Sequence, residues 1–181
     1  STQWADLDRE AVDRAVARRH VDQVAGCEEV RVDPCVLARD REPGAGLVVN
    51  TGYMVSSVLG IHKNDKDIAI IDASASTHMP DVLEVPYRPD IIGAEQPGVL
   101  AHSYILGGKT CMTGDIIGEY SFSNPLKPGD KLVFTDMMQY SFVKNNTFNG
   151  VPLPDLAILS ETGHYKVIRS FGYEEFRRRL G

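Results

Sequence analysis

The chain has 181 residues, of which 43% are hydrophobic, so it can bury one good core and lies near the upper size of a single domain. Its formal net charge is -6, and no basic run exceeds the arginine triplet at 177–179, which argues against nucleic acid or an anionic membrane as the main partner. The charge balance favours a small or cationic ligand instead. No apolar run approaches the roughly eighteen residues that span a bilayer, and the amino terminus carries charges where a signal peptide needs an apolar core. We therefore expect a soluble, cytoplasmic protein.

The cysteines and histidines indicate neither a disulfide framework nor a metal site. The three cysteines are an odd set without a CxxC pair, which fits a reducing compartment. The histidines at 78, 102 and 164 are too dispersed to suggest a metal centre.

The first 45 residues differ from the rest in the pattern of their apolar and polar residues. Residues 7–24 place apolar side chains on one stripe at helical spacing with charged side chains largely opposite, which predicts an amphipathic helix. Residues 27–41 indicate only a short strand, because Pro34 interrupts it. The candidate boundary near Gly46 divides the chain into segments 1–45 and 46–181.

After Gly46, short β-branched segments alternate with turn residues. A polar hairpin tip is expected at 62–67, and residues 68–72 form a continuous apolar run typical of a strand buried on both faces. A short helix is expected at 174–180. The other expected strands are 47–49, 54–59, 99–106, 114–122, 131–135, 141–143, 156–160 and 165–169. Many short strands separated by Gly, Pro and Asn are typical of a β-sandwich or barrel rather than an α/β sheet.

Several motifs together identify a family. They are GGKTCMTGD at 107–115, MQYS at 138–141 and TFNG at 147–150. The chain from about residue 42 onward resembles the carboxy-terminal part of fold-type III pyridoxal-phosphate (PLP) decarboxylases, a group that includes ornithine, diaminopimelate and carboxynorspermidine decarboxylases. HMPDVLE at 78–84 and PYRP at 86–89 are similar to the carboxynorspermidine branch. The resemblance implies a mainly β chain: a β-sandwich or Greek-key barrel over 46–181, preceded over 1–45 by a helix-strand remnant of the family's (β/α)8 barrel.

The resemblance also implies an activity and a partner. It implies PLP-dependent decarboxylation of carboxynorspermidine or carboxyspermidine to norspermidine or spermidine, in polyamine biosynthesis, by a homodimer that binds a polyamine-like substrate. The lysine that carries the cofactor and the glycine-rich phosphate loop belong to the family's barrel, and no motif of this chain matches them. We therefore expect the 181 residues alone to be an inactive portion. The alternative is a non-catalytic β-domain, or a remnant, that binds polyamines or a partner.

Cys111 and Asp115 are the candidate catalytic residues. From spacing alone, Cys111 is better interpreted as a small core hydrophobe. The resemblance instead implies that it reaches across the dimer interface into the partner's active site and helps to handle the carbanion left after carbon dioxide departs. Asp115 is similar to the family's acid that follows the cysteine, and a turn cap is its alternative role. Met112 stands where the ornithine branch has an acid suited to a short diamine.

The remaining candidates bind substrate or cofactor. Asp81 and Asp115 are proposed to pair the ammonium groups of the substrate, and Asp81 has a helix N-cap as its alternative role. Glu42 resembles the glutamate that lies against the pyridine nitrogen of the cofactor, although Ala45 departs from the polar residue usual near it. Tyr140 resembles the tyrosine that bonds the cofactor phosphate, and a buried strand tyrosine is its alternative. The segment 148–150 is expected to be structural rather than catalytic.

Overall fold

The computed structural model describes residues 48, 51–160 and 163–181. The expected helix at 7–24, the short strand within 27–41, the boundary near Gly46 and Glu42 lie outside the described residues. Of the expected strand at 47–49, Val48 is described, and it is helical. Among the described residues, no helix is both long and apolar enough to cross a membrane.

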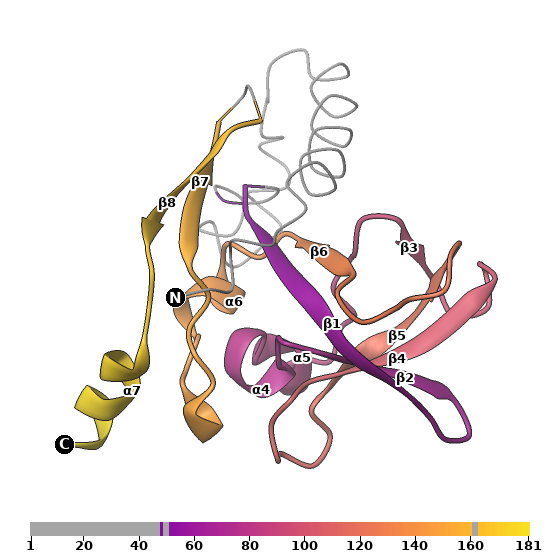
Figure 1. Cartoon of the computed structure of the whole chain (residues 1–181), viewed down its shortest axis with the longest axis horizontal. Coiled ribbons are helices and arrows are strands. Elements are labelled where there is room, and N and C mark those ends of the chain that lie inside the picture. Colours follow the sequence, from indigo (N-terminus) through magenta and orange to yellow (C-terminus); the bar gives the residue numbers. More distant parts are fainter. Residues whose placement is uncertain (1–47, 49–50, 161–162) are drawn as a thin grey trace.

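Most of the described strands form one curled sheet (Figure 1). Their order across the sheet is β3-β5-β4-β2-β1-β6. Only β2 and β4 run parallel, and the other neighbours are antiparallel. The strands are β1 (Tyr53–Lys63), β2 (Asp67–Ile71), β3 (Ala94–Glu95), β4 (His102–Gly107), β5 (Ile116–Phe122) and β6 (Lys131–Thr135).

The segment 90–95 connects the two sides of this sheet. Ile91 forms an antiparallel bridge with Phe134 on β6, and Ala94 pairs with Phe122 on β5. The same short segment therefore bonds near both ends of the strand order, which curls the sheet around one core. This confirms the predicted mainly β fold.

The core is built from side chains that alternate along the strands. Ile71, Leu106, Tyr120 and Phe134 are each at most 1% exposed. The prediction that the 68–72 strand is buried on both faces was only partly right, because Ala69 and Ile71 are fully buried whereas the residues between and before them are half-buried. One face of β2 packs on the core, and the other is covered incompletely.

Short helices follow the sheet strands and were mostly not predicted. α4 (Ala75–His78) and α5 (Asp81–Glu84) come after β2, and each is a single turn, too short for an apolar period to reveal. The strand expected at 141–143 was wrong, since this stretch is α6 (Tyr140–Val143). Its turn is closed by the N–H groups of Phe142 and Val143 donating to Gln139, and Val143 is 70% exposed. Within the described residues, 141–143 pair with no strand.

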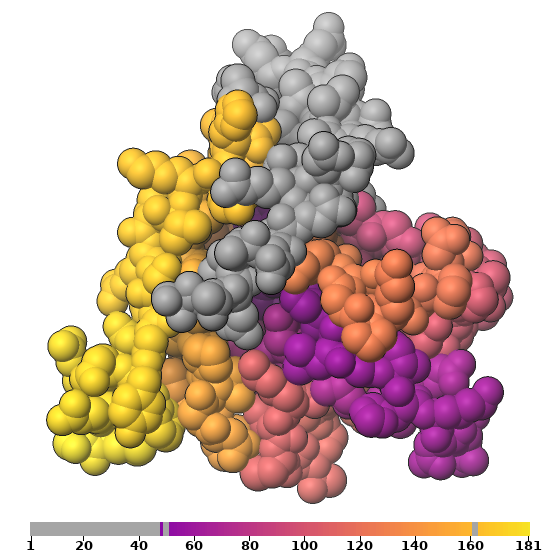
Figure 2. Space-filling model, in the orientation of Figure 1, coloured from indigo at the N-terminus to yellow at the C-terminus, as the bar shows by residue number. Residues whose placement is uncertain are grey.

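The last part of the chain forms a separate ribbon. β7 (Leu156–Leu159) pairs antiparallel with β8 (Tyr165–Arg169), and α7 (Tyr173–Leu180) follows. These match the expected strands and terminal helix closely. Figure 2 shows the ribbon and α7 along one side of the molecule, next to residues that follow α6.

Candidate functional site

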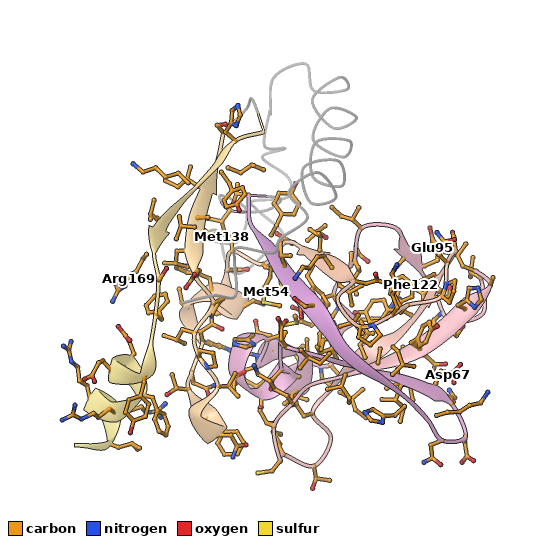
Figure 3. All side chains as sticks on the ribbon, viewed as in Figure 1. Met54, Asp67, Glu95, Phe122, Met138 and Arg169 are labelled. Atoms are coloured by element: carbon orange, nitrogen blue, oxygen red, sulfur yellow. The ribbon has the colours of Figure 1, made fainter. Side chains whose placement is uncertain are left out.

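The parallel pairing of β2 with β4 decides where the candidate residues meet. Ile70 lies opposite Gly107, so the two strands end at the same edge of the sheet. α4 begins shortly after β2, and the loop 108–115 follows β4. Asp67, at the start of β2, lies at the far end of the β1–β2 hairpin, away from this edge (Figure 3). The sheet therefore brings the 108–115 loop onto the start of α4.

The Asp115 carboxylate joins these two segments. Its Oδ1 accepts hydrogen bonds from the Ser74 hydroxyl at 2.9 Å and the Ala75 N–H at 2.8 Å. Its Oδ2 accepts from the Thr110 hydroxyl at 2.6 Å and the Thr110 N–H at 3.1 Å. Asp115 is only 7% exposed. A carboxylate that bonds this many protein donors holds its surroundings in place, so its contacts favour the cap role over direct pairing with a substrate cation.

Gly108 leaves the space that this carboxylate occupies. A Cβ on Gly108 would lie 2.3 Å from Asp115 Oδ2 and 2.5 Å from Asp115 Cγ. The Gly108 N–H also donates to the Asp115 carbonyl at 2.8 Å, which closes the base of the loop. The glycine is needed for close approach rather than for an unusual backbone angle.

Cys111 lies at the tip of this braced loop. Its side chain is exposed, so the interpretation of Cys111 as a core hydrophobe was wrong. Its N–H donates to Asn149 Oδ1 at 3.1 Å. The neighbouring Met112 is 40% exposed. The loop therefore carries an exposed thiol, and its base is held by the hydrogen bonds of Asp115.

A second group of candidates surrounds the Lys144 ammonium. Lys144 Nζ lies 2.7 Å from Asp81 Oδ1, 2.6 Å from Glu84 Oε2 and 4.5 Å from the centre of the Tyr140 ring. Hydrogen bonds to Asp81 and Glu84 raise the pKa of Lys144 above its ordinary value. Two carboxylates and an aromatic face are a suitable environment for a cation.

The alternative roles of Asp81 and Tyr140 do not fit their positions. Pro80, not Asp81, is the N-cap of α5, and Asp81 is the first residue of the helix. Tyr140 begins α6 and is half-buried, so it is not a buried strand tyrosine. Both side chains contact Lys144 instead.

α4 connects the two groups. Asn146, close to α6 in sequence, donates from its N–H to the Thr77 carbonyl at 3.0 Å and from Nδ2 to the Ser76 carbonyl at 2.8 Å. His78 accepts a bond from the Ser74 N–H at Nδ1, and its Nε2 lies 3.1 Å from the Pro152 carbonyl, to which it can donate. Asp115 thus lies against the start of α4, whereas Asp81 lies on the helix that follows it.

Burial lowers the pKa of His78 below 6.5, although the bond to Pro152 acts in the opposite direction. The neutral imidazole with its proton on Nε2 satisfies both neighbours. His78 is therefore a buried residue that joins α4 to the 146–152 segment. Among the described residues, no group of three or more His, Cys, Asp or Glu is placed to hold a metal ion.

Sequence reasoning missed several residues that build the site. Ser74 and Thr110 bind Asp115, Lys144 binds Asp81, and Asn149 binds Cys111. Of these residues, only Asn149 could have been found from the sequence, because an Asn followed by Gly is typical of a turn with left-handed backbone angles. The Ser74–Asp115 and Lys144–Asp81 pairs join residues 41 and 63 positions apart, and the Thr110–Asp115 pair depends on the detailed geometry of the loop.

Comparison with known proteins shows which family the chain is similar to. Residues 10–138 match the family model described as pyridoxal-dependent decarboxylase, C-terminal sheet domain. Carboxyaminopropylagmatine decarboxylase of Synechocystis is 44% identical over 141 residues, which cover 77% of this chain and 36% of the relative. Carboxynorspermidine/carboxyspermidine decarboxylase of Campylobacter jejuni is 40% identical over 152 residues, covering 76% of this chain and 39% of the relative. The chain thus spans well under half the length of these relatives.

A solved structure agrees with the sequence match. The crystal structure of carboxynorspermidine decarboxylase from Campylobacter jejuni, complexed with norspermidine, has a TM-score of 0.71 at 39% identity and covers 74% of this chain and 40% of that one. Diaminopimelate decarboxylase from Helicobacter pylori shares the fold with a TM-score of 0.61 at 21% identity. By sequence and by fold, the chain belongs to the pyridoxal-dependent decarboxylases and carries their carboxy-terminal sheet domain.

Proposed function

We propose that this chain serves in the PLP-dependent decarboxylation of carboxynorspermidine or carboxyspermidine, in polyamine biosynthesis. The observation that carries the proposal is the exposed Cys111 on a loop braced from below by Asp115, within the region that matches the decarboxylase family. The relatives named for these substrates and the neighbour complexed with norspermidine support the substrate class.

Cys111 acts in this proposal from one subunit into the active site of the other. The Cys111 side chain is exposed, whereas the base of its loop is bonded to α4. In this proposal the exposed thiol completes the active site of a second copy, which requires a homodimer with an isologous interface. Asp115 contributes by holding the loop.

Asp81 is the proposed substrate-cation residue, together with Glu84. These carboxylates already hold one primary ammonium, that of Lys144, at 2.7 and 2.6 Å. Asp81 retains 17% side-chain exposure and Glu84 56%, so a substrate ammonium can share or replace this contact. A long polyamine carries several such groups, and pairing them offsets the cost of removing them from water.

The described residues fit a small share of the cofactor site. Tyr140 is half-buried with the Lys144 ammonium against its ring, so its phenol can donate one hydrogen bond to a phosphate oxygen beside a positive charge. When bound, pyridoxal phosphate supplies an electron sink for the electron pair left on the substrate carbon. The proposal needs a barrel that carries the cofactor lysine and most of the phosphate contacts.

A second substrate is favoured by one specific observation. The Synechocystis relative, 44% identical, is named for carboxyaminopropylagmatine. That molecule also joins a carboxylated aminopropyl group to a cationic chain, but ends in a guanidinium. The planar guanidinium suits bidentate pairing with carboxylates, so Asp81 and Glu84 could discriminate between the two substrate types.

The test is carbon dioxide release by the polypeptide that joins this chain to its cofactor-binding barrel. Carboxynorspermidine, carboxyspermidine and carboxyaminopropylagmatine are compared with ornithine and lysine as controls. We expect a carboxylated polyamine to have the highest kcat/KM. Faster turnover of ornithine or lysine would contradict the specificity, and binding of polyamines without release from any substrate would support the non-catalytic alternative.

Subunit mixing tests the action of Cys111 across the interface. Cys111→Ala should lower turnover strongly without loss of fold, because the exposed thiol contributes little packing. Mixing it with a variant that lacks the cofactor lysine should restore up to about a quarter of wild-type activity through heterodimers with one intact site. No recovery, with subunit exchange shown independently, would mean that Cys111 acts within its own subunit.

A further inference from the structure

We infer that Asn149 is a positioning residue for Cys111, an inference whose catalytic meaning rests on the proposed function. The two residues are 38 positions apart, yet Asn149 Oδ1 accepts the Cys111 N–H at 3.1 Å. This contact fixes the backbone of the residue proposed to act in the partner's site. Figure 2 shows the orange residues that follow α6 beside the salmon loop that contains Cys111.

The backbone of Asn149 explains why asparagine suits this position. Its φ is 57° and its ψ is 16°, the left-handed region, and Gly150 follows with a φ of 70°. Asparagine, aspartate and glycine tolerate this conformation far better than other residues. Glycine would meet the backbone demand without an acceptor, and aspartate would meet both demands. Substitutions at position 149 can therefore remove the hydrogen bond to Cys111 while they keep the backbone turn.

The turn that carries Asn149 is itself held in place. Asn146 is bonded to the α4 carbonyls of Ser76 and Thr77, and its Oδ1 accepts the Phe148 N–H at 3.0 Å. The ring of Phe176, on α7, lies 3.8 Å from where a Cβ on Gly150 would be. The acceptor oxygen is thus anchored to the same helix that anchors the 108–115 loop.

Cys111 is held from two sides as a result. On one side Asp115 bonds the preceding Thr110, and on the other Asn149 bonds Cys111 itself. The Cys111 N–H makes no ladder bond, because the loop lies between β4 and β5 and belongs to neither strand. Without the Asn149 oxygen, this N–H would turn to water and the thiol direction would vary. A small displacement of a reacting group lowers the rate of the chemical step much more than it lowers binding.

The experiment compares Asn149→Gly, Asn149→Asp and Asn149→Ala. In the 181-residue chain, the amide hydrogen exchange rate of Cys111 reads the contact directly. In the barrel-containing enzyme, kcat and KM report the effect of this contact on catalysis. Asn64→Gly is the control for flexibility, since Asn64 is exposed at the β1–β2 tip and an Asn-to-Gly change there adds the same freedom to the unfolded chain.

For Asn149→Gly, we expect exchange of the Cys111 amide to accelerate about two- to tenfold, the range of one lost hydrogen bond. The value of kcat should fall about tenfold with KM little changed, and Asn149→Asp should restore both. Asn149→Ala should lose further thermal stability, because alanine is strained at this φ.

Three results would overturn the inference. An unchanged exchange rate in Asn149→Gly would mean that the contact does not hold Cys111. Faster exchange with wild-type kcat would mean that the contact does not serve catalysis, and the same loss in Asn64→Gly would mean a general effect of flexibility. An inactive wild-type enzyme would overturn the proposed function and the catalytic part of this inference, while the exchange rate would still report on the contact.

Discussion

Replacing Asp115 by asparagine should destabilise the chain far more than the same change at Asp72. Both carboxylates accept hydrogen bonds near the ends of β2, and they differ in how many oxygens they use. Asp72 takes the Ser56 hydroxyl at 2.6 Å and the Ser57 N–H at 2.8 Å with Oδ1. Asp115 uses both oxygens, with the Ala75 N–H on Oδ1 and the Thr110 N–H on Oδ2.

This difference sets the magnitude. Asparagine has one acceptor oxygen, so at position 72 it can keep both bonds and lose only their charge assistance, which costs about 1 kcal/mol. At position 115 either orientation of the amide places its NH₂ against a backbone N–H. The orphaned buried donor adds about 1–3 kcal/mol, which gives a total loss of about 3 kcal/mol. Hydroxyl donors can rotate to accept, so Ser74 adds little.

Urea and thermal unfolding of the 181-residue chain provide the measurement. A loss of about 3 kcal/mol corresponds to a fall in Tm of about 6–12 °C for a chain of this size, against about 2–4 °C for Asp72→Asn. Equal losses in the two variants would refute the reasoning, because they would show that the bonds to the second oxygen of Asp115 contribute nothing.

Two further predictions concern the same region. Gly108→Ala should lose about 1–3 kcal/mol of stability through overpacking, because its Cβ would lie 2.3 Å from an anchored Asp115 oxygen. Gly60→Ala, where the nearest atom to the new Cβ is His62 Nε2 at 3.5 Å, is the control, and an equal loss there would contradict the account. For His78, the folded-state pKa is lowered below 6.5, so the unfolded chain binds more protons in that range and stability should fall as the pH drops below about 6.5. The slope of unfolding free energy against pH should flatten in His78→Asn, and an unchanged slope would assign the pH dependence to other groups.

The amino-acid sequence by itself determined the class of fold and the family. Alternation of apolar and turn residues predicted β6 and β8 at their observed bounds, and β7 and α7 to within one residue, because these are set by local pattern. The motif around Cys111 indicated the decarboxylase family, which the match over residues 10–138 confirms. These features need only neighbours in sequence.

Local pattern failed where one helical turn is decided by its surroundings. Phe142 and Val143 fit a strand equally well, yet they lie in α6 and belong to neither of the two sheets of the described residues. α4 and α5 have four residues each, so no periodicity could distinguish them from turns.

The tertiary structure decided what the candidate residues do. Asp115 had two possible roles in the sequence, and the parallel pairing of β2 with β4 placed it against Ser74, where its carboxylate holds the loop. Cys111 was better interpreted as a core residue by spacing, yet the braced loop exposes it. The ammonium that Asp81 holds belongs to Lys144, 63 positions away. Contacts between segments far apart in the chain depend on strand order and register, which no local pattern of residues encodes.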